Sequence, residues 1–436
     1  MHKEEEPLIY SSEVDTQQCN RLKWNFILMS MAFSANHGSV VACLAYASTE
    51  LGDLKGAYGG GALYICYALT SFLLSKPTVS MVGPKTGLFL GVSGYCVYVA
   101  GFLVAVVLPW IAWPVFMIAA CIGGTAGGML WTAQGRYFAG NAKLYARASL
   151  KTLEDVNSEF AGIFAASYLG LECITKALAT IIFLEAPGSA PFVIFTIYTA
   201  IAFLATFAVT RLDDLGDHGT WTFDKDVVVT NVYATGRLMV SDSRLSLLVP
   251  FQIAFGLASS FVPFYVFGTV IADSDSLGGT YVGLLSAIIV LTGAAIAVPA
   301  GWAAQRFGKP VMMTIGAVGL MATGLAFFFF SDDQLGTWGM IIPYLIIYGI
   351  GRGTWENTNK AVVADYFGGS AETNTAAFAG IAFTSGLAGA FGYFAFNSMT
   401  RIQIAIMVFV SAVGALFAYY GSVAIHSNAK KSQQEV

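Results

Sequence analysis

The 436-residue chain has few charged residues, few cysteines and little sequence outside long hydrophobic runs. Only 11% of its residues are charged and 56% are hydrophobic, so the composition is far from that of a soluble domain. The six cysteines show the spacing of neither a disulfide framework nor a metal-binding cluster. No Asn-x-Ser/Thr sequence occurs, so N-glycosylation cannot report passage to the cell surface. These absences exclude a disulfide-rich secreted domain and indicate a protein surrounded by lipid.

The hydrophobic runs have the length of membrane-spanning helices. A span needs about 20 largely apolar residues, because every backbone polar group must be paired inside the segment. Twelve such runs are present, at 24–48, 56–76, 86–107, 113–137, 159–184, 190–210, 247–271, 280–302, 311–331, 338–359, 372–396 and 402–424. The first is too long for a signal-peptide core, so we expect it to be retained. The sequence therefore predicts an all-α polytopic membrane protein with about twelve transmembrane helices.

The polar segments outside these runs are short, and the longest one divides the chain near its midpoint. They are an N-terminal tail at 1–23, a central loop at 211–246 and a C-terminal tail at 425–436. The central loop separates a six-helix bundle at 24–210 from a second one at 247–424. Because no catalytic domain fits into these segments, we expect no enzyme activity. We also expect no cofactor, metal site or nucleic-acid partner.

The basic residues outside the predicted spans are distributed unevenly between the two sides of the membrane. If the N-terminus is cytoplasmic, that side carries the Lys and Arg residues of both tails, the central loop and most short loops, whereas the opposite side carries only Lys55 and Arg401. The opposite loops instead carry acids such as Asp273 and Asp332. Because basic loops are retained in the cytoplasm, both termini and the central loop are predicted to be cytoplasmic.

The N-terminal tail contains a pattern typical of adaptor-dependent sorting. Glu4 precedes the Leu8–Ile9 pair as the acid does in an acidic dileucine signal. An adaptor that binds Glu4, Leu8 and Ile9 in the cytosol would direct the protein to an endosomal, lysosomal or vacuolar membrane. The alternative is a merely acidic disordered tail, with the plasma membrane as the other location.

The two predicted halves share features that are common in transporters, whose substrate sites lie between structural repeats. In the fourth span Gly127 stands four residues before Trp131, and in the tenth Gly351 stands four residues before Trp355. The loop after the eighth span reads Gly-Trp-Ala-Ala-Gln-Arg-Phe-Gly-Lys from 301 to 309. It resembles the major facilitator loop motif Gly-x-x-x-Asp-Arg-x-Gly-Arg/Lys, with glutamine in place of the acid. The resemblance implies two six-helix halves in which spans one, four, seven and ten line a central cavity.

A narrower resemblance lies at the inner end of the fourth span. Residues 130–138 read Leu-Trp-Thr-Ala-Gln-Gly-Arg-Tyr-Phe, similar to the Leu-Trp-Thr-Ala-Gln-Gly-x-Tyr signature of the uncoordinated-93 (UNC-93-like) family, a eukaryotic branch of the major facilitator superfamily. Residues 349–359 look like that family's tenth-span segment, although Arg352 and Glu356 depart from its better-known animal members. Those members include ion-channel regulatory subunits and receptor-trafficking chaperones, so the resemblance supports the fold more than the cargo.

Two pairs of opposite charges lie within the predicted spans, where an unpaired charge costs about 2.5 kcal/mol or more. Glu172 and Lys176 in the fifth span, and Arg352 and Glu356 in the tenth, are each four residues apart and can pair on one helix face. Each pair either locks helices together or serves a substrate. In the second case, Arg352 binds an anionic or polar group through its planar guanidinium, and Glu356 carries a proton or contacts the substrate.

Other polar and aromatic residues at membrane depth are further candidates. Trp131 and Trp355 either cap the cavity or pack against neighbouring helices. His37 suits proton coupling near neutral pH, although an interhelical hydrogen bond is the alternative. The complete set of candidate substrate-binding or coupling residues is Asn36, His37, Trp131, Gln134, Glu172, Lys176, Gln252, Arg352, Trp355, Glu356 and Asn357.

Two classes of function fit these features. The first is a secondary transporter that moves a small solute or ion by alternating access, with proton coupling left open. The second is a non-transporting partner of a channel or receptor that keeps the fold. Charged residues at cavity positions favour transport, because a scaffold has less reason to bear their cost.

The topology gives the first testable prediction. Epitope tags at residue 2 and residue 436 should both be protected in sealed cells and become accessible when the plasma membrane is permeabilised, because the basic loops require both termini in the cytosol. Opposite accessibility of the two tags would rule out an even number of spans.

Overall fold

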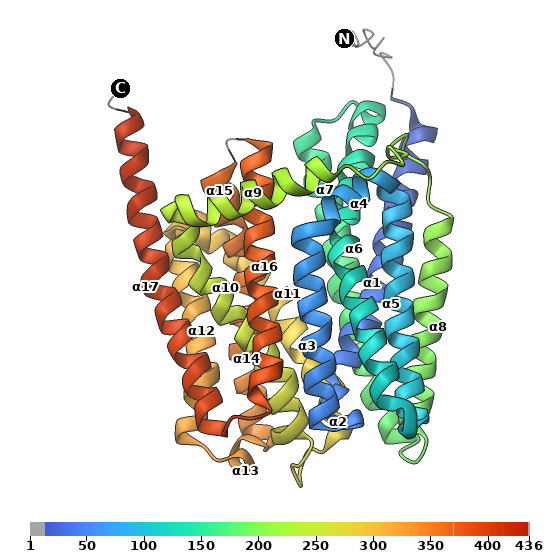
Figure 1. Cartoon of the computed structure of the whole chain (residues 1–436), viewed down its shortest axis with the longest axis vertical. Coiled ribbons are helices and arrows are strands. Elements are labelled where there is room, and N and C mark those ends of the chain that lie inside the picture. Colours follow the sequence, from blue (N-terminus) through green and yellow to red (C-terminus); the bar gives the residue numbers. More distant parts are fainter. Residues whose placement is uncertain (1–13, 369, 435–436) are drawn as a thin grey trace.

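The computed structural model describes residues 14–368 and 370–434, and over these residues it contains helices and no strand (Figure 1). The first half is built from α1 (Thr16–Ala45), α2 (Ala47–Leu51), α3 (Asp53–Leu69), η1 (Thr70–Leu74), α4 (Ser75–Val82), α5 (Pro84–Val107), η2 (Pro109–Ile111), α6 (Ala112–Ser149), α7 (Leu153–Glu185) and α8 (Ala190–Thr210). The predicted sorting residues Glu4, Leu8 and Ile9 lie outside the described residues.

The second half follows a connecting helix, α9 (Lys225–Ser241). It consists of α10 (Ser243–Phe261), η3 (Val262–Ile271), η4 (Gly279–Tyr281), α11 (Val282–Phe307), α12 (Lys309–Phe329), α13 (Asp332–Leu335), α14 (Trp338–Thr354), η5 (Trp355–Asn359), α15 (Lys360–Phe367), α16 (Ala371–Phe396) and α17 (Arg401–Gln434). The two halves stand side by side (Figure 1). We call the end where α1 begins and α17 ends the terminal end, and the opposite end, with α2 and α13, the far end.

Eleven helical segments of the described chain are long and apolar enough to cross a membrane. A twelfth continuous helix, α14–η5–α15, packs between α11 and α12 in the second half. Its apolar part, α14, is only 17 residues long, and Glu356, Lys360 and Asp365 follow it. The predicted all-α polytopic fold is confirmed, and the helix that departs most from a simple apolar span is the one that carries the candidate charges.

Glycines let the helices of the first half approach closely, because a backbone without a Cβ atom can lie against a neighbour in a lipid environment. A Cβ atom on Gly124 of α6 would lie 2.1 Å from the carbonyl oxygen of Leu63 on α3. One on Gly128 would lie 2.8 Å from the backbone nitrogen of Ser71 in η1. The Gly-rich run of α6 therefore fixes its contact with α3.

The halves contact one another along two seams, α3 with α16 and α7 with α11. On the first seam the rings of Phe72 and Phe383 stack with their centroids 4.5 Å apart. On the second, Gly283 of α11 lies so close to α7 that a Cβ atom would approach the Lys176 carbonyl oxygen to 2.2 Å. The packing of α7 against α11 brings the middle of α7 to the second half of the protein.

Direct hydrogen bonds join the halves toward the far end. The backbone nitrogen of Gly283 donates to the Tyr46 hydroxyl at 2.8 Å, and that of Leu284 donates to the Thr180 hydroxyl at 2.9 Å. The nearby helix α2 also packs on η3 of the other half. Burial raises the pKa of Glu50, on α2, to about 7. The far end is therefore closed by contacts between the halves.

At the terminal end, residues 213–221 of the predicted central loop lie against the first half. Arg21 of α1 donates two hydrogen bonds to the Asp213 carboxylate, at 2.8 and 3.0 Å. Arg136 of α6 pairs with Asp217 at 2.7 Å. This segment braces α1 and α6 together, and the sequence did not reveal it.

Candidate functional site

The two predicted charge pairs form one cluster that spans both halves. Lys176 Nζ lies 2.7 Å from Glu172 Oε1 on α7, and Arg352 Nε lies 2.8 Å from Glu356 Oε1 at the α14–η5 junction. Arg352 Nη2 also reaches Glu172 Oε1 at 3.5 Å. The sequence predicted two separate pairs, whereas the structure shares Glu172 between a lysine of its own helix and an arginine of the other half.

The four charges differ in their exposure to solvent. The side chains of Glu172 and Lys176 are 1% and 7% exposed, whereas those of Arg352 and Glu356 are 19% and 26% exposed. The remaining carboxylate oxygen of Glu172, Oε2, is buried without a hydrogen-bond partner among the described residues. The pair on α7 is therefore buried, and the pair on α14 and η5 is partly exposed.

An aromatic group lies beside the cluster. Tyr168, one helical turn before Glu172 on α7, bonds His37 Nε2 through its hydroxyl at 3.0 Å. The Trp131 ring of α6 packs edge-on against His37 and Tyr168, with centroids 5.5 and 5.7 Å away, and against Phe33 at 4.8 Å. His37 Nδ1 is buried without a partner among the described residues. The structure thus places His37 and Trp131 in one group next to Glu172.

A second polar cluster lies where α10 meets η5. Gln252 accepts a hydrogen bond from the Trp355 indole at 2.7 Å and exchanges amide contacts with Asn359 at 3.1 and 3.3 Å. The Trp355 ring stacks on Phe255 with a centroid distance of 3.8 Å. Because of the indole hydrogen bond, Gln252 and Trp355 are partners of each other. The π-helical turn at Trp355–Asn359 widens the helix locally, a distortion that is common at functional sites.

Three predicted residues take other positions. Asn36 is fully buried and donates to the carbonyl oxygens of Val92 and Ala202, at 3.2 and 3.3 Å, so it ties α1 to α5 and α8 within the first half. Asn357 donates to the Gly353 carbonyl of its own helix at 2.9 Å. Gln134 is buried on α6, three residues after Trp131. The contacts of Asn36 and Asn357 do not bring these residues into the charge cluster.

Sequence reasoning missed Tyr168, Asn359 and Asp365. Tyr168 stands four residues before Glu172, and this spacing alone placed it on the charged face of α7. Asp365 pairs with Lys309, at 2.5 Å, from the loop that resembles the major facilitator motif. The loop therefore forms an ion pair with α15 within the second half, although Gln305 stands where the motif has its acid.

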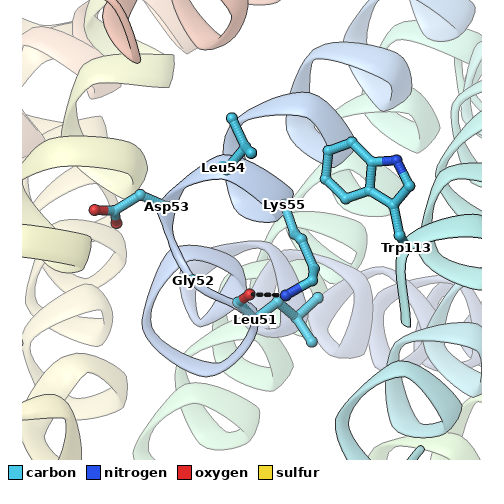
Figure 2. A pocket seen from close by; sticks show the side chains of 6 residues that line it. All are labelled: Leu51, Gly52, Asp53, Leu54, Lys55 and Trp113. Atoms are coloured by element: carbon cyan, nitrogen blue, oxygen red, sulfur yellow. Dashed lines mark hydrogen bonds between the residues drawn. The ribbon is translucent and has the colours of Figure 1, made fainter. Parts of the chain in front are cut away.

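A separate cavity opens at the far end, away from the charge cluster (Figure 2). Its volume is about 330 Å³, and it is lined by residues 51–55 and by Trp113. The Lys55 amine folds back onto the Leu51 carbonyl oxygen at 3.1 Å. Its lining contains none of the predicted site residues.

A two-part helical bundle with a charge cluster shared between its parts defines an integral membrane protein of transporter architecture. The chain belongs to the Major Facilitator Superfamily, whose family model matches residues 25–393. It is similar to Protein unc-93 homolog A from Bos taurus, with 22% identity over 92% of each chain. It is also similar to UNC93-like protein 3 from Arabidopsis thaliana, with 24% identity over 84% of this chain and 79% of that one. The predicted UNC-93-like resemblance is confirmed.

Solved structures of transporters share the fold. A mutant form of the nucleoside transporter NupG superimposes with a TM-score of 0.67 at 12% identity, over 92% of this chain and 99% of that one. A D-xylose-proton symporter gives a TM-score of 0.62 at 14% identity, over 93% of this chain and 96% of that one. These likenesses confirm the major facilitator fold, and family and fold together point to a non-enzymatic transporter.

The difference in exposure within the cluster gives a prediction about stability. Lys176→Met should destabilise the protein by about 3–5 kcal/mol, because it leaves the buried Glu172 with only its longer, 3.5 Å contact with Arg352. Arg352→Ala should cost much less, because Glu172 keeps Lys176 and Glu356 is partly exposed. Unfolding of the purified variants in detergent measures both changes.

The matched control is the double variant Lys176→Met with Glu172→Gln. It should recover much of the stability that Lys176→Met loses, which a double-mutant cycle detects as coupling. A loss with Arg352→Ala as large as that with Lys176→Met would contradict the division into a buried and a partly exposed pair.

Proposed function

We propose that the protein moves a small solute or ion across its membrane by alternating access, with Arg352 and Glu356 as the residues that contact the solute. The observation that carries the proposal is the contact of Arg352 with Glu172 of the other half. Buried charges are costly in a membrane protein and are kept mainly where a pathway or coupling site uses them. A pure scaffold would fill these positions more stably with apolar side chains.

The geometry supports Arg352 as the residue that exchanges partners. Its contact with Glu172 at 3.5 Å is longer than its 2.8 Å contact with Glu356. A carboxylate, phosphate or other polar group of a solute can replace the longer contact, because the guanidinium offers several donors in one plane. Glu172 then keeps Lys176, so the exchange strands no charge. Since Glu172 belongs to the first half, loss of its contact with Arg352 frees the two halves to rock.

Proton coupling is part of the proposal, with two candidate carriers. A proton on Glu356 would remove its charge and weaken its hold on Arg352. His37, bonded to Tyr168 next to Glu172, is the second candidate. The other predicted residues have supporting roles: Trp131 packs beside His37, and Gln252 and Trp355 hold η5 in place.

The orientation of the protein in its membrane is inferred from the distribution of its basic residues. We infer that the terminal end faces the cytosol, which places both termini and the central loop 211–246 between the two bundles on that side. The membrane is endosomal, lysosomal or vacuolar if an adaptor binds Glu4, Leu8 and Ile9, and otherwise the plasma membrane. The alternative function, a regulatory or trafficking partner, rests on the UNC-93-like relationship.

Uptake into proteoliposomes tests the proposal. With a panel of anionic, zwitterionic and neutral metabolites and ions, the wild-type protein should show counterflow of at least one solute. Arg352→Ala should abolish that counterflow while the protein stays folded, because it removes the proposed solute contact. Arg147→Ala, an exposed arginine at the terminal end of α6, is the matched control and should retain activity.

Glu356→Gln separates binding from coupling. If Glu356 carries the proton, this variant should keep solute counterflow but lose accumulation driven by a pH gradient, because an amide cannot be protonated in this range. Full counterflow in Arg352→Ala, with the same solute affinity as the wild type, would remove Arg352 from the site. Lack of transport throughout the panel, with a folded protein, would favour the regulatory alternative.

A further inference from the structure

The helix α9 connects the halves and presents an apolar face that the rest of the chain does not cover. Its first turn is capped by the Asp224 side chain, which accepts a hydrogen bond from the Asp226 backbone nitrogen at 2.8 Å. Val229, Tyr233 and Val240 are exposed, with Val240 at 87%. Their spacing of four and seven residues places them on one side of the helix.

The position of α9 places it at the flank of the bundle. Thr235 and Met239, on its opposite side, pack against Gly380 of α16. Gly380 lies nine residues after the start of α16, which corresponds to about 14 Å along the helix axis. The end of α16 therefore projects past α9, and α9 runs across the sides of the helices near their terminal end (Figure 1). Its uncovered face therefore points away from the bundle.

A groove of about 270 Å³ lies between α9 and α16. Its lining combines hydroxyl groups with one basic side chain, and it consists of Thr230, Tyr233, Ala234, Arg237, Leu238, Ser241, Thr373 and Ala376. Arg237 is exposed and forms no ion pair with another described residue. Hydroxyl donors around a free guanidinium fit a phosphate group, and the neighbouring apolar face fits acyl chains.

We propose that α9 lies in the membrane surface and binds an acidic phospholipid in the groove between α9 and α16, with the lipid phosphate at Arg237 and the acyl chains against Val229, Tyr233 and Val240. A lipid is the occupant because the phosphate-binding groups continue directly into an apolar face at the edge of a membrane-spanning bundle. The helix also contacts α4 and η1 of the first half, so the lipid site adjoins the seam between α3 and α16.

Lipid retention by the purified full-length protein tests the proposal. Native mass spectrometry with added phosphatidylglycerol should show lipid-bound protein at lower lipid concentration than with phosphatidylcholine. Arg237→Gln should raise the half-saturating phosphatidylglycerol concentration about fivefold, the effect of one cation at an acidic membrane surface. Arg147→Gln should leave it unchanged, and soluble glycerol phosphate should not compete, because it has no acyl chains.

A second measurement reports the location of α9 independently of the arginine. A fluorophore attached to cysteine at position 240, in a variant without native cysteines and reconstituted in nanodiscs, should be quenched by spin-labelled lipids and protected from aqueous iodide. Iodide quenching without lipid quenching would overturn the proposal, because the face would then lie in water, available to a protein partner. An unchanged phosphatidylglycerol dependence in Arg237→Gln would also overturn it, as would competition by glycerol phosphate.

Discussion

The contact of Arg352 with Glu172 is an ion pair that links the two halves in the middle of the bundle. Four ionised side chains lie in the middle of a protein of which only 11% is charged, and none of them can be left alone there without a large cost. Lys176 on α7 and Glu356 on η5 are the counter-ions nearest in sequence to Glu172 and Arg352. Glu172 also contacts Arg352, which belongs to the other half. The close approach of α7 to the second half is therefore accompanied by an electrostatic contact as well as by packing against α11.

The contacts at the two ends of the bundle complement this central one. Toward the far end, Tyr46 and Thr180 of the first half accept hydrogen bonds from the backbone of α11. At the terminal end, the partly exposed ion pairs of Arg136 and Lys309 lie within each half and do not cross between the halves. The two halves also pack along the α3–α16 and α7–α11 seams, and a rocking movement would have to rearrange these contacts. In the proposed mechanism, the partner exchange of Arg352 links solute binding to that movement.

Much of the fold could be predicted from the sequence, because apolar run length and basic-residue asymmetry act on each segment separately. The ends of the helices were harder to predict from the sequence. The fourth predicted span ended at residue 137, whereas α6 continues to Ser149, because helices project beyond the membrane where hydropathy gives no signal. The helix α9 was hidden inside a loop, since its mixed polar composition resembles a linker and only its position on α16 reveals an amphipathic helix.

The site was predictable only within single helices. A spacing of four residues identifies Glu172 with Lys176 and Arg352 with Glu356, but no spacing reports that two helices 180 residues apart in sequence meet. For the same reason, the sequence did not indicate that Gln252 and Asn359 on η5 are hydrogen-bond partners. Polar residues such as Asn36 could not be distinguished from site residues, because a buried amide at membrane depth needs partners in either role.

The distance between the two halves at the terminal end reports whether the contact of Arg352 with Glu172 holds the halves together. Spin labels at positions 147 on α6 and 305 on α11, in a variant without native cysteines and reconstituted in nanodiscs, report this distance by pulsed electron paramagnetic resonance. We expect Glu172→Gln to add a second distance population, because the carboxylate that contacts Arg352 across the halves is gone. Identical distance distributions with and without the Glu172→Gln substitution would show that this contact does not control the arrangement of the halves.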